Sequence, residues 1–170
     1  MRVSAKGEYA AKAVLYLSLK HPSLVCIHEV AERHSIPVKY LEHILLALKK
    51  AGILQSQRGV RGGYRLAREP QAISVGEVLR VVDGNFSGTG CNQSSQPAGY
   101  LCPEMQTCGL KQLWQDVGSA VDGILFRTTF DHLRQQTLAG MVLNRLLVWA
   151  PDTGVRRKIL VDNPARLYAF

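Results

Sequence analysis

Three cysteines lie close together in the middle of the chain, in the pattern C-x10-C-x5-C: Cys91, Cys102 and Cys108. The segment that holds them, residues 84–108, is rich in Gly, Ser, Pro and Gln and has no hydrophobic periodicity. A loop of this length in a compact domain is usually functional or disordered, and the three thiols favour a function. With one further ligand, three thiolates suit an iron–sulfur cluster or a structural zinc ion. Three redox-active thiols are the remaining alternative.

The surroundings of the cysteines refine this hypothesis without deciding between the metals. Cys108 directly precedes a predicted helix, whose dipole stabilises a thiolate and an anionic cluster. Zinc is the competing metal, and spacing alone does not separate a zinc site from an iron–sulfur site. The fourth cysteine, Cys26, stands apart among apolar neighbours, so we expect it to be a small buried side chain.

The composition predicts a cytoplasmic globular protein. The chain has 170 residues, of which 46% are hydrophobic, enough for a real core. Its N-terminus, MRVSAKGEYAAKAVLYL, lacks the layout of a signal peptide, and no apolar run reaches the length of a membrane helix. Because cytoplasmic thiols stay reduced, clustered cysteines there indicate metal binding or redox sensing rather than disulfides.

The excess of positive over negative charge lies entirely in the first part of the chain. Residues 1–68 hold 12 Lys/Arg and 4 Asp/Glu, a net charge of +8, whereas residues 69–170 hold 9 of each, a net charge of zero. A polyanion such as DNA would bind such a basic region, because phosphate contacts supply most non-specific affinity. A solvated basic face is the alternative that charge alone leaves open.

The elements of residues 1–83 predict a winged helix-turn-helix. Helical spacing indicates helices over residues 4–20, 28–34 and 38–51, and a basic glycine-rich turn separates two short strands at residues 53–57 and 64–66. Two short helices, a turn, a longer helix and a basic hairpin make up this fold. The third helix has a predicted buried stripe of Leu41, Ile44, Leu45 and Leu48. We therefore expect a mainly α fold with a small β-wing.

Two groups of residues are the predicted DNA contacts. A recognition helix presents short polar or basic groups at its N-terminal end, and a wing needs glycines for close approach and arginines for the minor groove. The exposed positions of the third helix are predicted to be Val38, Lys39, Tyr40, Glu42 and His43, and the wing residues are Arg58, Gly59 and Arg61. His28 and His34 are interpreted as further surface or phosphate-contacting groups.

The rest of the chain predicts a dimerising arm. A helix is expected over residues 75–83, and a long one begins near Gly109. An apolar stripe follows the long helix for four turns, which favours a dimerisation region at residues 109–136, with an ordinary core helix as the alternative. Residues 137–170 have no assigned role. They are expected to add a helix up to Trp149 and an irregular tail after Pro151.

Several strings together carry a family resemblance. The run VAERHSIPVKYLEHILLALKKAGILQSQRGVRGGYRLAREPQAISVGEVLRVVDG, followed by CGLKQLWQDV and TTFDHL, resembles the bacterial IscR/NsrR/CymR family of regulators from residue 1 to about residue 133. The resemblance implies a homodimer with crossed long helices that binds a palindromic operator in double-stranded DNA. It also implies that Lys39, Tyr40, Glu42 and Arg58 lie where relatives contact DNA.

The same resemblance implies a [2Fe-2S] or [4Fe-4S] cluster on the three loop cysteines, with a variable fourth ligand. Regulators of iron–sulfur biogenesis use a histidine three residues after the last cysteine, but here that position is Lys111. Nitric-oxide sensors use a carboxylate from the first helix of the partner subunit, and the matching residue is Glu8. The x10 spacing is longer than is typical of these sensors, and a solvated helix residue is the alternative for Glu8.

The sequence therefore predicts a DNA-binding regulator that senses iron, nitric oxide or redox state. The family resemblance implies a repressor and makes zinc the less favoured metal. The alternative is a cluster-free regulator resembling CymR, controlled by thiol oxidation or a protein partner. No enzyme is expected. The tail ILVDNPARLYAF faintly resembles the last segment of metal-dependent amidohydrolases, but 170 residues leave no room for their barrel.

Overall fold

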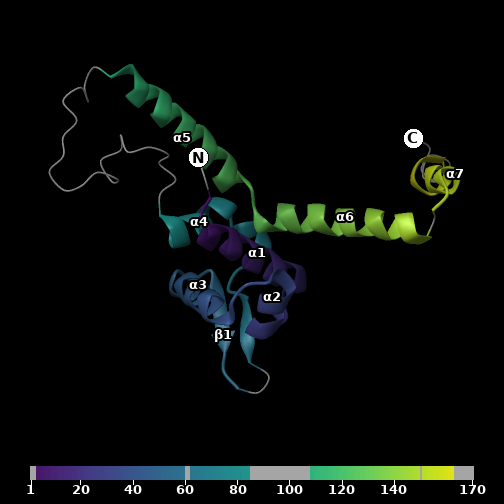
Figure 1. Cartoon of the computed structure of the whole chain (residues 1–170), viewed down its shortest axis with the longest axis horizontal. Coiled ribbons are helices and arrows are strands. Elements are labelled where there is room, and N and C mark those ends of the chain that lie inside the picture. Colours follow the sequence, from purple (N-terminus) through teal and green to yellow (C-terminus); the bar gives the residue numbers. More distant parts are fainter. Residues whose placement is uncertain (1–2, 60–61, 85–107, 150, 163–170) are drawn as a thin grey trace. The chain divides into compact units, whose positions relative to one another are not determined.

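The predicted mainly α fold with a small β-wing is confirmed (Figure 1). The computed structural model describes residues 3–59, 62–84, 108–149 and 151–162. Its helices and strands, in chain order, are α1 (Ala5–Lys20), α2 (Ile27–His34), α3 (Val38–Lys50), β1 (Leu54–Gln57), β2 (Gly63–Leu66), the 3-10 turn η1 (Pro70–Ala72), α4 (Val75–Asp83), α5 (Gly109–Arg127), α6 (Phe130–Trp149), α7 (Thr153–Arg157) and the π-helical turn η2 (Lys158–Asp162).

The core of the head lies between α1, α3 and α4. The hydroxyl of Ser4 caps α1 by accepting the Gly7 N–H at 3.0 Å. The predicted stripe of α3 is confirmed, since all four of its residues are at most 1% exposed. Gly52 ends this helix with a φ of 73°, a left-handed conformation that glycine adopts without strain.

The turn between α2 and α3 sets the angle of the helix-turn-helix. Ser35 has a φ of 53° and ends α2, and the N–H of Ile36 donates to the Ala31 carbonyl at 2.9 Å. Ile36 is buried, which fixes the turn to the core. Pro37 then precedes α3, whose predicted start at Val38 is confirmed.

The wing is an antiparallel pair, with Leu54 opposite Leu66 and Gln57 opposite Gly63. The backbone of Val25 joins β2 by two hydrogen bonds of 2.9 Å with Tyr64. Gly63 allows this close approach, because a Cβ there would lie 2.4 Å from the Val25 carbonyl oxygen. The chain before α2 is therefore fixed to the base of the wing.

The start of α6 belongs to the head. The Phe130 N–H donates to the Ile73 carbonyl and the Val75 N–H to the Thr128 carbonyl, both at 2.9 Å. Phe130 is fully buried. The chain divides into two compact units, residues 1–132 and 133–170, so the boundary falls inside α6.

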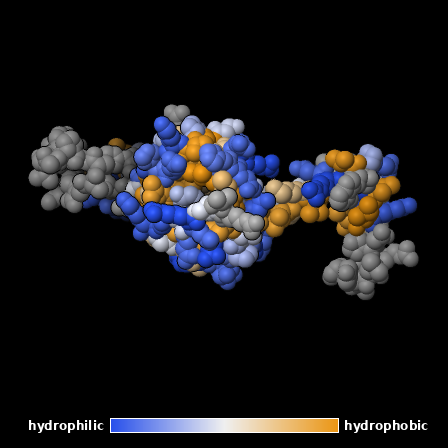
Figure 2. Space-filling view, turned by 90° about the horizontal axis from the view of Figure 1, so that it is seen from below, coloured by the Kyte–Doolittle hydropathy of each residue, from blue (hydrophilic) through white to orange (hydrophobic). Residues whose placement is uncertain are grey.

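The second unit holds the rest of α6, α7 and η2. Asp152 caps α7 by accepting the Val155 N–H at 2.9 Å. The expectation of an irregular tail after Pro151 is wrong for residues 153–162, which are helical, whereas the expected helix to Trp149 is confirmed as α6. Figure 2 shows apolar side chains on the surface of this unit, interspersed with hydrophilic ones. Within the described residues, no helix is long and apolar enough to span a membrane.

Candidate nucleic-acid interface

The outer face of α3 is polar, opposite its buried stripe. Lys39, Glu42 and His43 are exposed, and Val38 is half-buried. Tyr40 is 40% exposed, and its ring meets the Tyr9 ring of α1 edge to face, with centroids 5.9 Å apart. The helix therefore presents the predicted residues on one surface, with the Tyr40 ring held by an aromatic contact.

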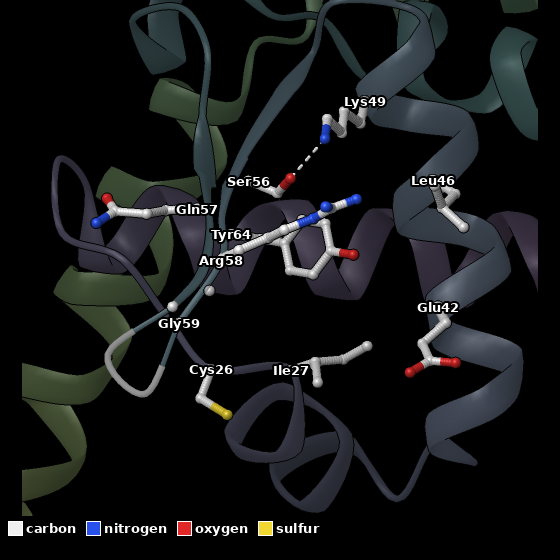
Figure 3. A pocket seen from close by; sticks show the side chains of 12 residues that line it. Cys26, Ile27, Glu42, Leu46, Lys49, Ser56, Gln57, Arg58, Gly59 and Tyr64 are labelled. Carbon is white, nitrogen blue, oxygen red and sulfur yellow. Dashed lines mark hydrogen bonds between the residues drawn. The ribbon is translucent and has the colours of Figure 1, made fainter.

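A groove of about 450 Å³ lies between α3 and the wing (Figure 3). Its walls come from α3, from the start of α2 and from both strands, and its lining residues are Cys26, Ile27, Glu42, Leu46, Lys49, Ser56, Gln57, Arg58, Gly59, Gly62, Gly63 and Tyr64. Arg58 extends across the groove toward α3 in Figure 3. Lys49 donates to the Ser56 hydroxyl at 2.7 Å, which links the helix to β1.

Glycines shape the tip of the wing. Gly59 has a φ of 115°, which a residue with a side chain rarely adopts. The Gly62 N–H donates to the Gly59 carbonyl at 2.9 Å, and a Cβ on Gly62 would lie 2.4 Å from the Gln57 carbonyl oxygen. Arg61, the second predicted wing arginine, lies outside the described residues. The described tip is thus narrow, and the side chain of Arg58 is exposed beside it.

The expectation that Cys26 is buried is wrong. Cys26 is exposed, precedes α2 as its N-cap residue and lines the groove. Its sequence neighbour Val25 takes the buried position by pairing with β2, so the alternation of the extended backbone turns the next side chain outward. Lys49 was also missed as a groove residue. Its position seven residues after Glu42 places both on one helix face, a signal that the sequence does contain.

The histidines of the head differ from one another. His28 and His43 are exposed, as expected. His34 is half-buried and packs edge to face on Tyr16, with centroids 5.6 Å apart, so its interpretation as a surface residue is wrong. Burial, and then the positive charges of Arg33 and Lys12, lower the pKa of His34. A neutral ring at this place contributes no positive charge toward DNA at neutral pH.

The predicted metal ligands are described only in part. Cys108 is a half-buried free thiol at the N-cap of α5, where no side chain caps the helix. Glu8 lies in the first turn of α1, is exposed and pairs with Lys12 at 2.6 Å. Cys91 and Cys102 lie outside the described residues, among which no three His, Cys, Asp or Glu side chains form a metal site. The ligand set therefore stays a prediction.

Comparison with known proteins identifies the family to which this chain is similar. The profile of the Rrf2 family, described as "Iron-dependent Transcriptional regulator", matches residues 3–136. The chain belongs to the Rrf2 family. It is 35% identical over 134 residues to the HTH-type transcriptional regulator IscR of Vibrio cholerae, covering 78% of this chain and 75% of that protein. It is 32% identical over 153 residues to IscR of Erwinia tasmaniensis, covering 89% and 85%.

Solved Rrf2-family structures share its fold. The chain resembles CymR, the global cysteine regulator of B. subtilis, with a TM-score of 0.66, 29% identity and coverage of 80% of this chain and 98% of that one. It resembles IscR of T. potens with a TM-score of 0.63, 30% identity and coverage of 81% and 88%. The chain is thus a winged helix-turn-helix transcription regulator related to IscR and CymR, a DNA-binding protein and not an enzyme.

Proposed function

We propose that this Rrf2-family chain is a homodimeric repressor that senses iron, nitric oxide or redox state through a [2Fe-2S] or [4Fe-4S] cluster. The observation that carries the proposal is the place of Cys108, a half-buried free thiol at the start of α5. A helix N-terminus stabilises a thiolate ligand and an anionic cluster. The family's description as iron-dependent supports the same chemistry.

The chemistry of the predicted thiolate and carboxylate ligands suits an iron–sulfur cluster. Cys108, Cys91 and Cys102 would supply three thiolates, and Glu8 of the partner subunit would supply the fourth ligand. A bound cluster would add charge and would require protein ligands, and both its charge and its ligation would change with iron supply, oxidation or nitrosylation. Because Cys108 is the N-cap residue of α5, a change in its ligation acts directly on the start of that helix.

Dimer formation through α5 is the second part of the proposal. The C-terminal half of α5 packs on α4, where Arg80 lies over the Phe126 ring at 4.3 Å from its centroid. The N-terminal half has an apolar face of Leu110, Leu113, Trp114 and Val117 that is 39–59% exposed in the single chain. A helix with one such face free is typical of a helix that pairs with a second copy. Two heads joined this way would present two copies of α3 to a palindromic operator.

Regulation follows from the strict geometry of half-sites. Recognition helices must enter the major groove at a fixed spacing, so a small shift of α5 between the cluster-bound and cluster-free states would change operator affinity. Lys39, Tyr40, Glu42 and His43 would face the bases and phosphates of the major groove. Arg58 and Arg61, with Gly59 between the strands, would enter the minor groove.

Anaerobic purification followed by an absorbance spectrum and assays for iron, sulfide and zinc tests the proposal. We expect broad charge-transfer bands in the region of roughly 400 nm with matching iron and sulfide. Zinc without iron would make the site structural. A colourless, metal-free protein would contradict the proposed cluster.

A second candidate is supported by the exposed thiol of Cys26. A CymR-like regulator without a cluster would respond to thiol oxidation or to a partner protein, and Cys26 lies in the groove between α3 and the wing. One of the similar solved structures is an oxidised form of CymR from Staphylococcus aureus, with a TM-score of 0.62 and 29% identity. If this candidate holds, peroxide should weaken DNA binding of the metal-free chain, and Cys26→Ala should abolish that response.

Arg58→Ala is expected to weaken operator binding by about 1–3 kcal/mol, because a minor-groove arginine supplies both charge and shape readout. The measurement is fluorescence anisotropy with a duplex that the wild-type chain selects from a randomised pool. Arg65→Ala is the matched control, since Arg65 carries the same charge on β2 but bonds to Gln55 and does not line the groove. Equal losses in the two variants would mean that only net charge matters and would remove Arg58 from the wing contact.

Glu8→Ala is expected to make the cluster labile while leaving the fold intact. Glu8 is exposed and pairs only with Lys12 among the described contacts, so little stability depends on it. The measurement is the rate at which the visible absorbance decays in air. Lys12→Ala breaks the same ion pair and should leave this rate unchanged. A Glu8→Ala cluster as stable as the wild-type one would exclude Glu8 as a ligand.

A further inference from the structure

The start of α1 donates two side-chain hydrogen bonds to the end of α4. The hydroxyl of Ser4, which caps α1, donates to Asp83 Oδ1 at 2.5 Å. Lys6 Nζ also donates to the Val82 carbonyl at the end of α4, at 3.0 Å. The start of α1 thus receives a carboxylate and the end of α4 receives an ammonium group, the charges that the two helix ends favour.

Gly7 makes this junction close. It is buried, and a Cβ at this position would lie 2.3 Å from Asp83 Oδ2 and 3.1 Å from Leu79 Cδ2. Asp83 is the last residue of α4, and Gly84, with a φ of 81°, leads from it into the cysteine segment. The first turn of α1 therefore holds the point where the cysteine segment leaves the head.

The same stretch of α1 also reaches the recognition helix. Tyr9 follows Gly7 by two residues, and its ring meets that of Tyr40 at 5.9 Å with an interplanar angle of 84°. Tyr40 lies in the first turn of α3, on the exposed face described above. Asp83 and Tyr40, far apart in sequence, are thus both in contact with a three-residue stretch of α1, residues 7–9.

We infer that Asp83 and Tyr9 are positioning residues for Tyr40. Asp83 fixes the first turn of α1 through Ser4 and Gly7, and Tyr9, which directly follows that turn, fixes the Tyr40 ring and the start of α3. A displacement at the end of α4 would reach the DNA-reading surface by this route. That this route carries a signal from the cysteine segment rests on the proposed function, whereas the positioning of Tyr40 requires only DNA binding.

The test is a double-mutant cycle on DNA affinity, with the full chain and a duplex that the wild-type chain selects from a randomised pool. Tyr9→Ala is expected to weaken binding roughly threefold to tenfold, the range of an aromatic pair, while Tyr9→Phe keeps the ring contact and binds like wild type. Affinity for a scrambled duplex should not change. Asp83→Ala should act in the same direction, and the double variant should bind no more weakly than the weaker single one. Losses that simply multiply would overturn the inference.

Two further variants separate position from charge. Gly7→Ala changes no charge but displaces Asp83, so it should weaken selected-duplex binding in the wild-type background. It should have a smaller effect in the Asp83→Ala background, where only the 3.1 Å approach to Leu79 remains. Asp122→Ala removes the same charge from α5, where the nearest partner is Arg80 at 3.8 Å, and should leave affinity unchanged. An Asp122→Ala effect equal to that of Asp83→Ala would mean that net charge, not position, is measured. Tyr9→Leu replaces Tyr9→Ala if the latter does not fold.

The cycle is measured on metal-free chain and then on chain purified with its metal. If the effects of Tyr9→Ala and Asp83→Ala on DNA affinity are coupled but the chain never binds iron, the positioning role is retained and the proposed cluster is rejected. If the chain binds a cluster but the losses of DNA affinity in the two single variants multiply, the positioning role is rejected and the proposed cluster is retained. If the route carries the signal, Asp83→Ala should also bring the affinities of the two states closer together, within about twofold of each other; an undiminished difference would reject the signalling part.

Discussion

The Cys108→Ala chain, purified anaerobically, should show no visible cluster absorbance and contain no stoichiometric iron or sulfide. The proposed cluster, with three thiolate ligands and a carboxylate, would lose its ligand at the start of α5 when Cys108 is removed, and the remaining donors would not suit iron–sulfur chemistry. The same loss is expected for Cys91→Ala and Cys102→Ala. The measurements are the absorbance spectrum and the iron and sulfide contents of each variant.

Cys26→Ala is the matched control, because it also removes a thiol but one that lies in the groove beside α2. It should retain the spectrum and metal content of the wild-type chain. If Cys26 were required and Cys91 dispensable, the ligand set would be wrong. Circular dichroism separates loss of the cluster from loss of the fold, since the helices of the head do not depend on Cys108.

The sequence alone was sufficient for the elements whose side chains follow one period. The apolar residues of α3 repeat at helical spacing and all fall on one face of the helix, so both the helix and its buried face could be predicted. The wing was recognisable because glycines and arginines between two short strands permit few other structures. The assignment of the head to DNA binding needed the charge asymmetry in addition to these elements.

Contacts between distant parts of the chain were beyond the sequence argument. Cys26 was expected in the core because its neighbours are apolar, but the pairing of Val25 with Tyr64 decides which side chain turns outward. The contacts of Asp83 with Ser4 and of Tyr9 with Tyr40 depend on how α1 packs on α4 and α3, which no local pattern encodes. The helical turns after Pro151 were missed because a stretch of ten residues carries little periodicity.

The apolar face of α5 leads to the prediction with the broadest consequence. Trp114→Asp should separate the proposed dimer into folded monomers, because it places a charge in the centre of the exposed stripe of Leu110, Leu113, Trp114 and Val117. Each dimer carries the substitution twice, and a central aromatic contributes about 2 kcal/mol or more, so dimer affinity should fall roughly 1000-fold. Sedimentation velocity measures the oligomeric state, and anisotropy measures binding to the selected duplex.

Operator binding should weaken when the dimer is lost, because a monomer engages one half-site at a time and loses the gain in affinity from the linked second site. Gln115→Asp adds the same charge one residue along the helix, off the apolar stripe, and should leave both the dimer and DNA binding intact. Cluster absorbance adds a third readout: if Glu8 of the partner subunit is a ligand, the Trp114→Asp monomer should lose its cluster in air as fast as the Glu8→Ala dimer. A Trp114→Asp chain that remains dimeric would show that the two subunits join through another surface, and the exposed face of α6 would then be the next to test.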